Sequence, residues 1–503
     1  MEPSSLAELG KSIDAAADAL DVDRLSELTV VSQNMAASAS DDERVDLHYF
    51  AANALGAISH IKQRNDPDYA WSWRQEEAIN EVLALRTAIN DPSFQHKDIV
   101  RRCQIRTNLG NRLNSLGRCI EAIEQWNEVL ATIPHFAMAL GNKAHCLVYY
   151  SRELYDDGHQ LVLLDAALKG FNAALAEGAF WDSGPHPRAE AQFRERAGEV
   201  GRYLEWAGYE PISDPNAWSL GKSKAERLYR KWCLSEGLFL NPLNDALSDS
   251  IAAADVFHLP SHTYKIDEHA RFPAYFNLLK QEYVSARYRL YDAMNEQERH
   301  FSDNDVLLFE TFDGAILRYK TEQLKAAYRT TYGLFDKIAL FLNDYFSVGM
   351  RPDDVSLRKI WTEKVKGSPT YTLRQPFQDS RNWPLRGLYF LSKDLFDPAF
   401  VESAEPDAAR LAALRHAAEH RFLTLQEYDA REPSNDTLSY ITEEDFEAKT
   451  LRLLKMARAA LIYLSLAMCR EEEIRREKDD GEEGKLIASV PGIPRNARPR
   501  RRR

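Results

Sequence analysis

Apolar residues recur at spacings of three and four positions along most of the 503-residue chain. Stretches in which apolar and polar residues alternate are rare, and glycine and proline gather in a few places. A period of about 3.6 residues puts the apolar side chains on one face of a helix, whereas strict alternation is typical of a strand. The pattern therefore predicts an all-α protein.

The second half of the chain carries the longest of these periodic stretches. Helices are expected over 275–294, 316–346, 385–397, 407 to about 428, and 443 to about 478. Four or more helices joined by loops of unequal length are typical of a helical bundle. We therefore predict a bundle over 275–478 and a bridging helical segment over 201–274.

The first half of the chain predicts stacked helix pairs. The stretch "NLGNRLNSLGRCIEAIEQWNEVLATIP", residues 108–134, resembles a tetratricopeptide repeat. Small side chains at Gly110 and Ala122 would let two helices approach closely, Trp126 would fill the space between them, and Pro134 would stop the second helix. The resemblance implies a tetratricopeptide-like array over residues 1–200, a fold that binds proteins or peptides.

Composition narrows the function classes. The net charge is -13, so the whole surface does not attract polyanions, and any nucleic-acid site has to be local. The five cysteines include no CxxC pair, which disfavours a zinc knuckle or a disulfide framework and predicts a reduced, cytoplasmic protein. No apolar run is long enough to span a membrane. Residues 479–503 end in consecutive arginines and predict a disordered basic tail.

The stretch "LRHAAEHRFL", residues 414–423, concentrates ionisable side chains between alanines and leucines. On a continuous helix the apolar stripe would comprise Leu411, Leu414, Ala418, Phe422 and Leu425. Four polar side chains would lie together beside that stripe: Arg415, His416, Glu419 and His420.

Three interpretations of this cluster compete. The plainest is an exposed Arg415–Glu419 ion pair at i, i+4 with two unrelated histidines, contributing about 0.3 kcal/mol to stability. The second is a zinc peptidase, because "HAAEH" has the form H-x-x-E-H, in which His416 and His420 would bind the metal and Glu419 would act as base. That site needs a third protein ligand further along the chain.

The third interpretation rests on the spacing R-x4-H, from Arg415 to His420. An arginine, a polar residue and a histidine in this spacing, near the end of the third helix of a four-helix bundle, resemble the signature of the HEPN superfamily. Residues 240–264 and 276–294 further resemble a subfamily in which a tetratricopeptide-like array precedes the HEPN domain. His416 stands where asparagine is the commonest residue of the family.

The resemblance implies an endoribonuclease that needs no metal or other cofactor, of a kind found in toxins and antiviral effectors. The 2′-hydroxyl of RNA would be the nucleophile, with His420 as acid and base and Arg415 as clamp on the phosphate. His416 and Arg421 would add contacts to RNA, and Glu419 would orient Arg415. Products would carry a 2′,3′-cyclic phosphate and a 5′-hydroxyl.

Helix geometry adds an expectation about assembly. Positions 415 and 420 lie about 140° apart around a helix and about 7.5 Å apart along it. The two side chains of one copy would therefore diverge too far to grip one phosphate comfortably. A homodimer with two such helices at one cleft would supply four groups, and HEPN domains are known to dimerise. A non-catalytic scaffold, with a peptide-binding array and a bundle that only dimerises, remains the alternative.

Overall fold

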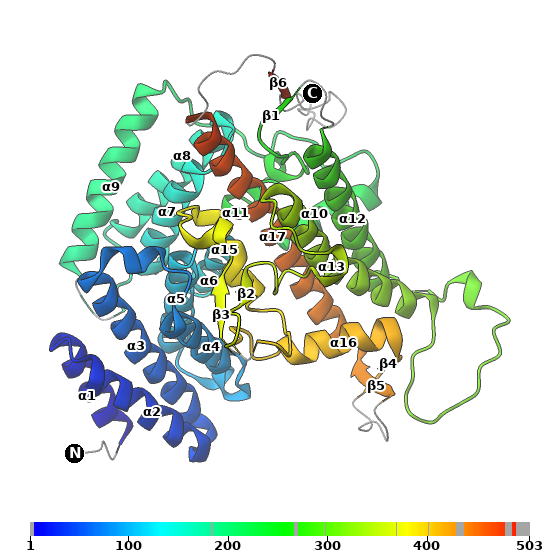
Figure 1. Ribbon diagram of the computed structural model, residues 1–503, viewed down its shortest axis with the longest axis horizontal. Helices are drawn as coiled ribbons and strands as arrows, with labels where there is room; N and C mark the ends of the chain where they lie inside the picture. Colours follow the sequence, from blue (N-terminus) through cyan, green and yellow to red (C-terminus); the bar gives the residue numbers. More distant parts are fainter. Residues whose placement is uncertain are drawn as a thin grey trace. The chain divides into compact units, whose positions relative to one another are not determined.

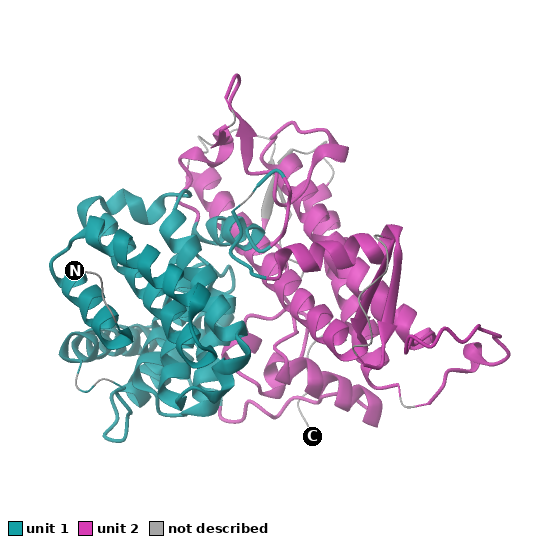
Figure 2. Cartoon of the chain, turned by 90° about the horizontal axis from the view of Figure 1, so that it is seen from below, with its two compact units in different colours: residues 1–212, 383–394, 399–406 teal, residues 213–382, 395–398, 407–503 magenta. Residues whose placement is uncertain are grey.

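The structure, a computed structural model, describes residues 5–182, 184, 186–265, 270–296, 298–368, 370–400, 402–428, 437–477 and 485–488. These residues are mostly helical, which confirms the predicted all-α class. They form two compact units (Figure 2). Unit 1 comprises residues 1–212, 383–394 and 399–406, and unit 2 comprises 213–382, 395–398 and 407–503.

Unit 1 is an array of helices in which neighbours in sequence pack against one another (Figure 1). Its helices are α1 (Leu6–Asp18), α2 (Val22–Ser38), α3 (Asp41–Asn65), α4 (Glu76–Asn90), α5 (Ile99–Ser115), α6 (Cys119–Thr132), α7 (Ala137–Arg152), α8 (Asp157–Ala174), α9 (Pro187–Trp206) and α15 (Trp383–Ser392). The expected helical array is present, whereas its assignment as tetratricopeptide repeats stays a prediction.

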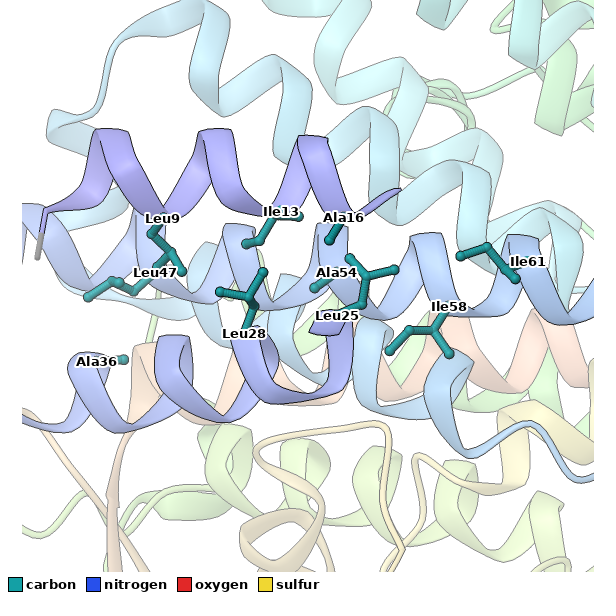
Figure 3. Packing of buried hydrophobic residues seen from close by; sticks show 10 residues of the cluster. All are labelled: Leu9, Ile13, Ala16, Leu25, Leu28, Ala36, Leu47, Ala54, Ile58 and Ile61. Carbon is teal, nitrogen blue, oxygen red and sulfur yellow. The ribbon is translucent and has the colours of Figure 1, made fainter. Parts of the chain in front are cut away.

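The first three helices of unit 1 share one apolar core (Figure 3). Leu9 and Ile13 on α1 face Leu25 and Leu28 on α2, and α3 adds further apolar side chains, including Ile58. Each of these residues is almost completely buried. The three- and four-residue spacing of their positions is the pattern that predicted helices here.

The hairpin of α5 and α6 has the close approach that its small residues predict. A Cβ atom added to Gly110 would lie 2.7 Å from Nε1 of the buried Trp126, so a larger side chain would displace the indole. Gly117, in the turn between the two helices, has a φ of 85°, which disfavours side chains. The same turn meets α15: a Cβ atom on Gly387 would lie 2.2 Å from the carbonyl oxygen of Gly117.

The position of α15 corrects the predicted domains. Residues 383–394 and 399–406 pack within unit 1, so the bundle is not the continuous segment 275–478 that the sequence suggested. The ring of Tyr389 on α15 lies 5.0 Å from that of Trp73, centroid to centroid. The expected helix over 385–397 also ends earlier, at Ser392. Periodicity finds a helix but does not reveal which core it enters.

A buried ionic cluster fixes this segment. Asp394 accepts hydrogen bonds from Arg118 at 2.6 Å and from Arg86 at 2.7 Å, and Arg86 also lies 3.3 Å from Glu405. The side chains of Asp394 and Arg118 are each 1% exposed. Charges removed from water to this extent are tolerated only when they are paired, so the cluster depends on all its members.

Unit 2 holds the bundle. Its long helices are α12 (Arg271–Met294), α13 (Tyr319–Tyr345) and α17 (Glu443–Glu477), which pack on one another (Figure 1), and the shorter α16 (Ala408–His420) packs on α13. The predicted helices over 275–294, 316–346 and 443–478 agree with these to within a few residues. Short helices α10 (Lys224–Ser235), α11 (Leu243–Ala246) and α14 (Gln375–Gln378) complete the unit.

Most of the predicted bridging segment, 201–274, belongs to unit 2 rather than to a separate linker. Two buried arginines hold it. Arg287 on α12 pairs with Asp255 at 2.7 Å, and Arg458 on α17 pairs with Asp245 at 2.6 Å. The segment is therefore part of the bundle's own core.

Three two-stranded sheets complete the described chain. Strands β4 (Phe422–Gln426) and β5 (Leu438–Thr442) are parallel, whereas β2 (Thr362–Lys364) pairs with β3 (Tyr371–Leu373), and β1 (His262–Lys265) with β6 (Lys485–Ala488), in antiparallel fashion. Strand β6 lies within the predicted disordered tail, 479–503, so that prediction is wrong for residues 485–488. The remainder of the tail lies outside the described residues. Among the helices described, none is both long enough and apolar enough to span a membrane.

The ionic cluster at Asp394 yields a test. We expect Asp394→Asn to lower the free energy of unfolding by about 3 kcal/mol or more, because the buried guanidinium of Arg118 and the partly buried one of Arg86 lose their shared carboxylate. Burial alone would raise the pKa of Asp394, but Arg118 and Arg86 outweigh it and hold that pKa below its usual range. The wild type should therefore be more stable than the variant above about pH 4, and this difference in the free energy of unfolding should shrink as the pH falls.

Urea unfolding between about pH 3 and pH 7 measures this difference. Asp354→Asn is the control, because Asp354 pairs with Arg351 and both side chains are more than half exposed. We expect the control to cost less than about 1 kcal/mol. Equal losses in the two variants would contradict the structural role of Asp394.

Candidate functional site

Helix α16 ends within the cluster that the sequence singled out. Leu411, Leu414 and Ala417 are buried, so the apolar stripe passes through Ala417 and not through the expected Ala418. The helix stops at His420 rather than near residue 428, and Arg421 has extended backbone angles. The following "FLTLQ" is strand β4, in which Leu423 and Leu425 are buried and Phe422 is exposed. Apolar residues that fit a helical stripe by spacing belong here to an alternating strand.

Contacts along α16 fix its position on the bundle. The carboxylate of Asp407, just before the helix, accepts a hydrogen bond from Lys449 of α17 at 2.8 Å. From α13, the hydroxyl of Tyr328 donates to the carbonyl of Leu411 at 2.7 Å, and Arg329 donates to that of Ala418 at 3.2 Å. The last carbonyls of a helix lack partners within the helix, so a cation there is favourable.

Arg415 is held by three groups. The carbon of its guanidinium lies 4.7 Å from the ring centroid of Tyr332. The Nη2 atom lies 3.1 Å from Oδ2 of Asp336, and the Nε atom lies 3.4 Å from Oε2 of Glu419. Tyr332 and Asp336 are one helical turn apart on α13, and Glu419 is one turn from Arg415 on α16. The Arg415 side chain remains 34% exposed, so it is oriented by the protein and still reachable from solvent.

His420 lies closer to this arginine than helix geometry suggested. Its Nε2 is 3.6 Å from Oε2 of Glu419, the same oxygen that is 3.4 Å from Nε of Arg415. The tips of Arg415 and His420 therefore converge on one oxygen, although their positions on the helix diverge. The divergence of about 140° therefore describes the backbone positions and not the side-chain tips, and the need for a second chain to bind one phosphate stays a prediction.

The remaining predicted residues lie at the same end of α16. The ring of His416 is 5.2 Å from that of His420, centroid to centroid, and both residues are exposed, His420 by 64%. Arg421 is exposed at the junction with β4 and donates its backbone N–H to Ala417. The five predicted residues therefore gather at one exposed end of the helix.

Burial shifts the pKa values of two side chains that contact Arg415, Asp336 and Tyr332. Burial raises the pKa of this carboxyl above its usual range, and the nearby Arg415 only partly offsets that effect. Burial also raises the pKa of the Tyr332 phenol, to about 12, so its ring contacts Arg415 in the neutral form. Asp336 thus takes up a proton more readily than an ordinary aspartate.

Sequence reasoning missed two residues of the site, Tyr332 and Asp336. Both belong to "TYGLFDKIALFL", in which one aspartate follows tyrosine by four positions and is surrounded by apolar residues. An acidic side chain near the apolar face of a helix is the signal that could have found Asp336, because such a charge needs a partner.

The H-x-x-E-H interpretation gains no third ligand from the structure. Within the described part of the chain, no three His, Cys, Asp or Glu side chains are grouped so that they could hold a metal ion.

Comparison with known proteins places this part of the chain in a family. Residues 263–471 match the family model described as LA2681-like HEPN. No curated protein and no solved structure matches the chain. The matched segment includes α12, α13, α16 and most of α17, and with them every residue of the candidate site.

The raised pKa of Asp336 can be tested. We expect Asp336→Asn to change the free energy of unfolding at neutral pH by about 1 kcal/mol or less, because both partners of the ion pair are a third exposed. A carboxyl with a raised pKa stabilises the folded state only while it is protonated. The stability of the wild type relative to this variant should therefore decrease as the pH rises above about 4.

The same urea titrations across pH measure this effect, with Asp394→Asn as the reference, because its carboxyl has a lowered pKa. As the pH rises, the free energy of unfolding of the wild type should increase relative to Asp394→Asn and decrease relative to Asp336→Asn. A wild-type advantage that grew with pH at both positions would contradict the burial argument for Asp336.

Proposed function

Through residues 263–471 the chain belongs to the HEPN superfamily, and from this premise we propose that it is an endoribonuclease that cleaves RNA without a metal ion. The observation that carries the proposal is the convergence of Arg415 and His420 on one carboxylate oxygen at an exposed helix end. An arginine and a histidine that share one anionic oxygen are equipped to share a phosphate oxygen in its place.

The reaction needs few groups from the protein. The 2′-oxygen of a ribose attacks the adjacent phosphorus and loses its proton, the bond from phosphorus to the 5′-oxygen breaks, and that oxygen gains a proton. His420 is assigned the proton transfers and Arg415 the charge that develops on the phosphoryl oxygens. The products are a 2′,3′-cyclic phosphate and a 5′-hydroxyl.

Asp336, Tyr332 and Glu419 act through Arg415 and are positioning residues. Tyr332 and Asp336 hold the guanidinium from the side of α13, which leaves its solvent-facing donors for the substrate. Glu419 occupies the place proposed for a phosphate oxygen, so it has to move when RNA binds. His416 and Arg421 supply further polar contacts at the same helix end.

The wider role is proposed as that of a toxin or antiviral effector in the cytoplasm. The helical array of unit 1 would bind a protein or peptide that sets when the bundle acts. A homodimer remains part of the proposal, because paired copies would present two such sites to one RNA.

A non-catalytic scaffold is the main rival. It predicts that the bundle dimerises and the array binds a peptide, with no chemistry at Arg415. A zinc peptidase is the third candidate, and it depends on His416 and His420 as metal ligands.

Replacing either proposed catalytic residue should separate these functions. We expect Arg415→Ala and His420→Ala each to lower RNA cleavage by about two orders of magnitude or more, the usual scale for losing an acid–base group or an oxyanion clamp. The cost in stability should be on the order of 1 kcal/mol, because neither side chain is buried. Purified protein incubated with total cellular RNA, followed by mapping of the cut ends, measures the rate.

Arg410→Ala is the matched control, because Arg410 lies on the same helix and its side chain is 54% exposed. It should fold and cut like the wild type. A His420→Ala protein that folds and cuts at the wild-type rate would remove the catalytic assignment and favour the scaffold.

Chelation distinguishes the metal-dependent alternative. Cleavage should continue in EDTA, because the proposed steps use only protein side chains and the ribose hydroxyl. Loss of activity in EDTA that zinc restores would favour the H-x-x-E-H interpretation instead.

A further inference from the structure

Two apolar features of unit 2 are complementary to each other. One is an exposed loop tip between α12 and α13, residues 304–312, which we call the arm (Figure 1, the long loop between the green helices). The other is a groove between α12 and α13 with a volume of about 700 Å³. We propose that the arm of one chain occupies the groove of a second copy, so that two chains exchange arms in a dimer.

The arm has the composition of a docking segment. Its sequence is "NDVLLFETF", and Leu307, Phe309 and Phe312 are 99%, 95% and 86% exposed. Apolar side chains exposed together in this way are uncommon on a monomer surface and are typical of an interaction site. The acidic residues Asp305 and Glu310 interrupt the run, which keeps it soluble when it is unpaired.

The groove offers matching surfaces. Leu279 and Phe341 are buried and form its base, while Tyr275, Leu278 and Leu340 are exposed around them. Lys337 and Glu282 also line the groove and pair with each other at 2.6 Å, so the match between groove and arm rests on their apolar side chains. Its volume suits a few large apolar side chains, since ligand pockets begin at about 300 Å³.

Both ends of the arm are fixed to the bundle. On one side, the carboxylate of Asp303 accepts the backbone N–H of Tyr319 at 3.0 Å, at the start of α13. On the other side, the carbonyl of Asp313 accepts a hydrogen bond from Gln426 at 2.6 Å, and Ile316 donates to Leu425 at 2.7 Å. Only the tip between these anchors is free to engage a partner.

The arm cannot reach the groove of its own chain. Nine residues that leave and return to fixed anchors extend by about 15 Å at most. The nearest part of the groove on α13, Lys337, lies about 27 Å along the helix from Tyr319, at about 1.5 Å per residue. An arm in the groove therefore comes from another copy of the chain.

A two-fold axis between two chains would place each arm in the groove of the other chain. The arm lies at the end of the helix pair where α12 ends and α13 begins, and the groove lies toward the opposite end. When two such helix pairs lie antiparallel, each arm reaches the groove of the other chain. Both arms and both grooves are then occupied, so the assembly closes as a dimer. Leu340 in the groove is one turn from Asp336, so the partner's arm would lie near the contact that orients Arg415.

This inference deepens the proposed dimer and is independent of RNA cleavage, so its test measures association. Two differently tagged chains, one with Leu307→Cys and one with Leu278→Cys, are mixed and oxidised. The five native cysteines are buried, which keeps background crosslinking low. We expect a disulfide between the two chains, whereas no such link would overturn the proposal.

The contribution of the contact is measured by light scattering across protein concentrations. The double variant Leu307→Asp with Phe309→Asp, and separately Leu278→Asp, should each raise the dimer dissociation constant at least about tenfold, because a charge would be buried in an apolar contact. Leu228→Asp, at a half-exposed position on α10, is the control and should leave it unchanged.

The outcomes separate the two proposals. A wild-type dimer that is unaffected by both groove and arm variants would overturn the arm contact and leave the dimer in place. A wild-type protein that stays monomeric at all concentrations would overturn both the dimer and the arm contact, while RNA cleavage by that monomer would still support the ribonuclease.

Discussion

The contact between α13 and α16 is the constraint on which the candidate site depends. Helix α16 is short and rich in alanine, so its own side chains bury little surface. Tyr328, Tyr332 and Asp336 follow one another at four-residue spacing on α13, and each contacts α16 or its Arg415. Because these three positions form one stripe of a rigid helix, they set the position of α16 and the direction of the guanidinium together.

The end of α16 is equally important to the site. A helix that continued to residue 428 would have enclosed His420 in a regular turn and extended the polar face. The chain instead becomes extended at Arg421, and Leu423 and Leu425 enter the core as alternating strand residues. His420 is therefore the last helical residue, exposed and next to Glu419.

Sequence reasoning succeeded where the determining contacts are local. The periodicity of 443–478 sets the boundaries of α17, and the small side chain of Gly110 predicts the close approach of Trp126. Leu425 fits a helical stripe with Phe422 and an alternating strand with Leu423, and only the pairing of β4 with β5 decides between them.

Long-range ionic contacts account for the remaining differences between the predicted and the observed structure. Asp394 and Asp336 look alike in the sequence, as single acidic residues close to apolar stretches. Asp394 meets two arginines that lie 308 and 276 positions earlier in the chain, and its segment joins unit 1. Asp336 meets Arg415, and burial keeps its pKa high. Neither partner can be inferred from spacing along the chain, because the pairings depend on tertiary packing.

The charge around Arg415 bears on the RNA site proposed for this acidic protein. The chain carries a net charge of -13, and Arg415 is already paired with Asp336 and Glu419, so little long-range attraction for phosphate remains. Affinity at the proposed site would then depend on short-range contacts that form once Glu419 gives up its place to a phosphate oxygen. Because the exchange replaces one anion by another beside Arg415 and His420, it costs little in local charge. The geometry of Arg415 and His420, rather than the field of the whole protein, would decide whether a phosphate is bound.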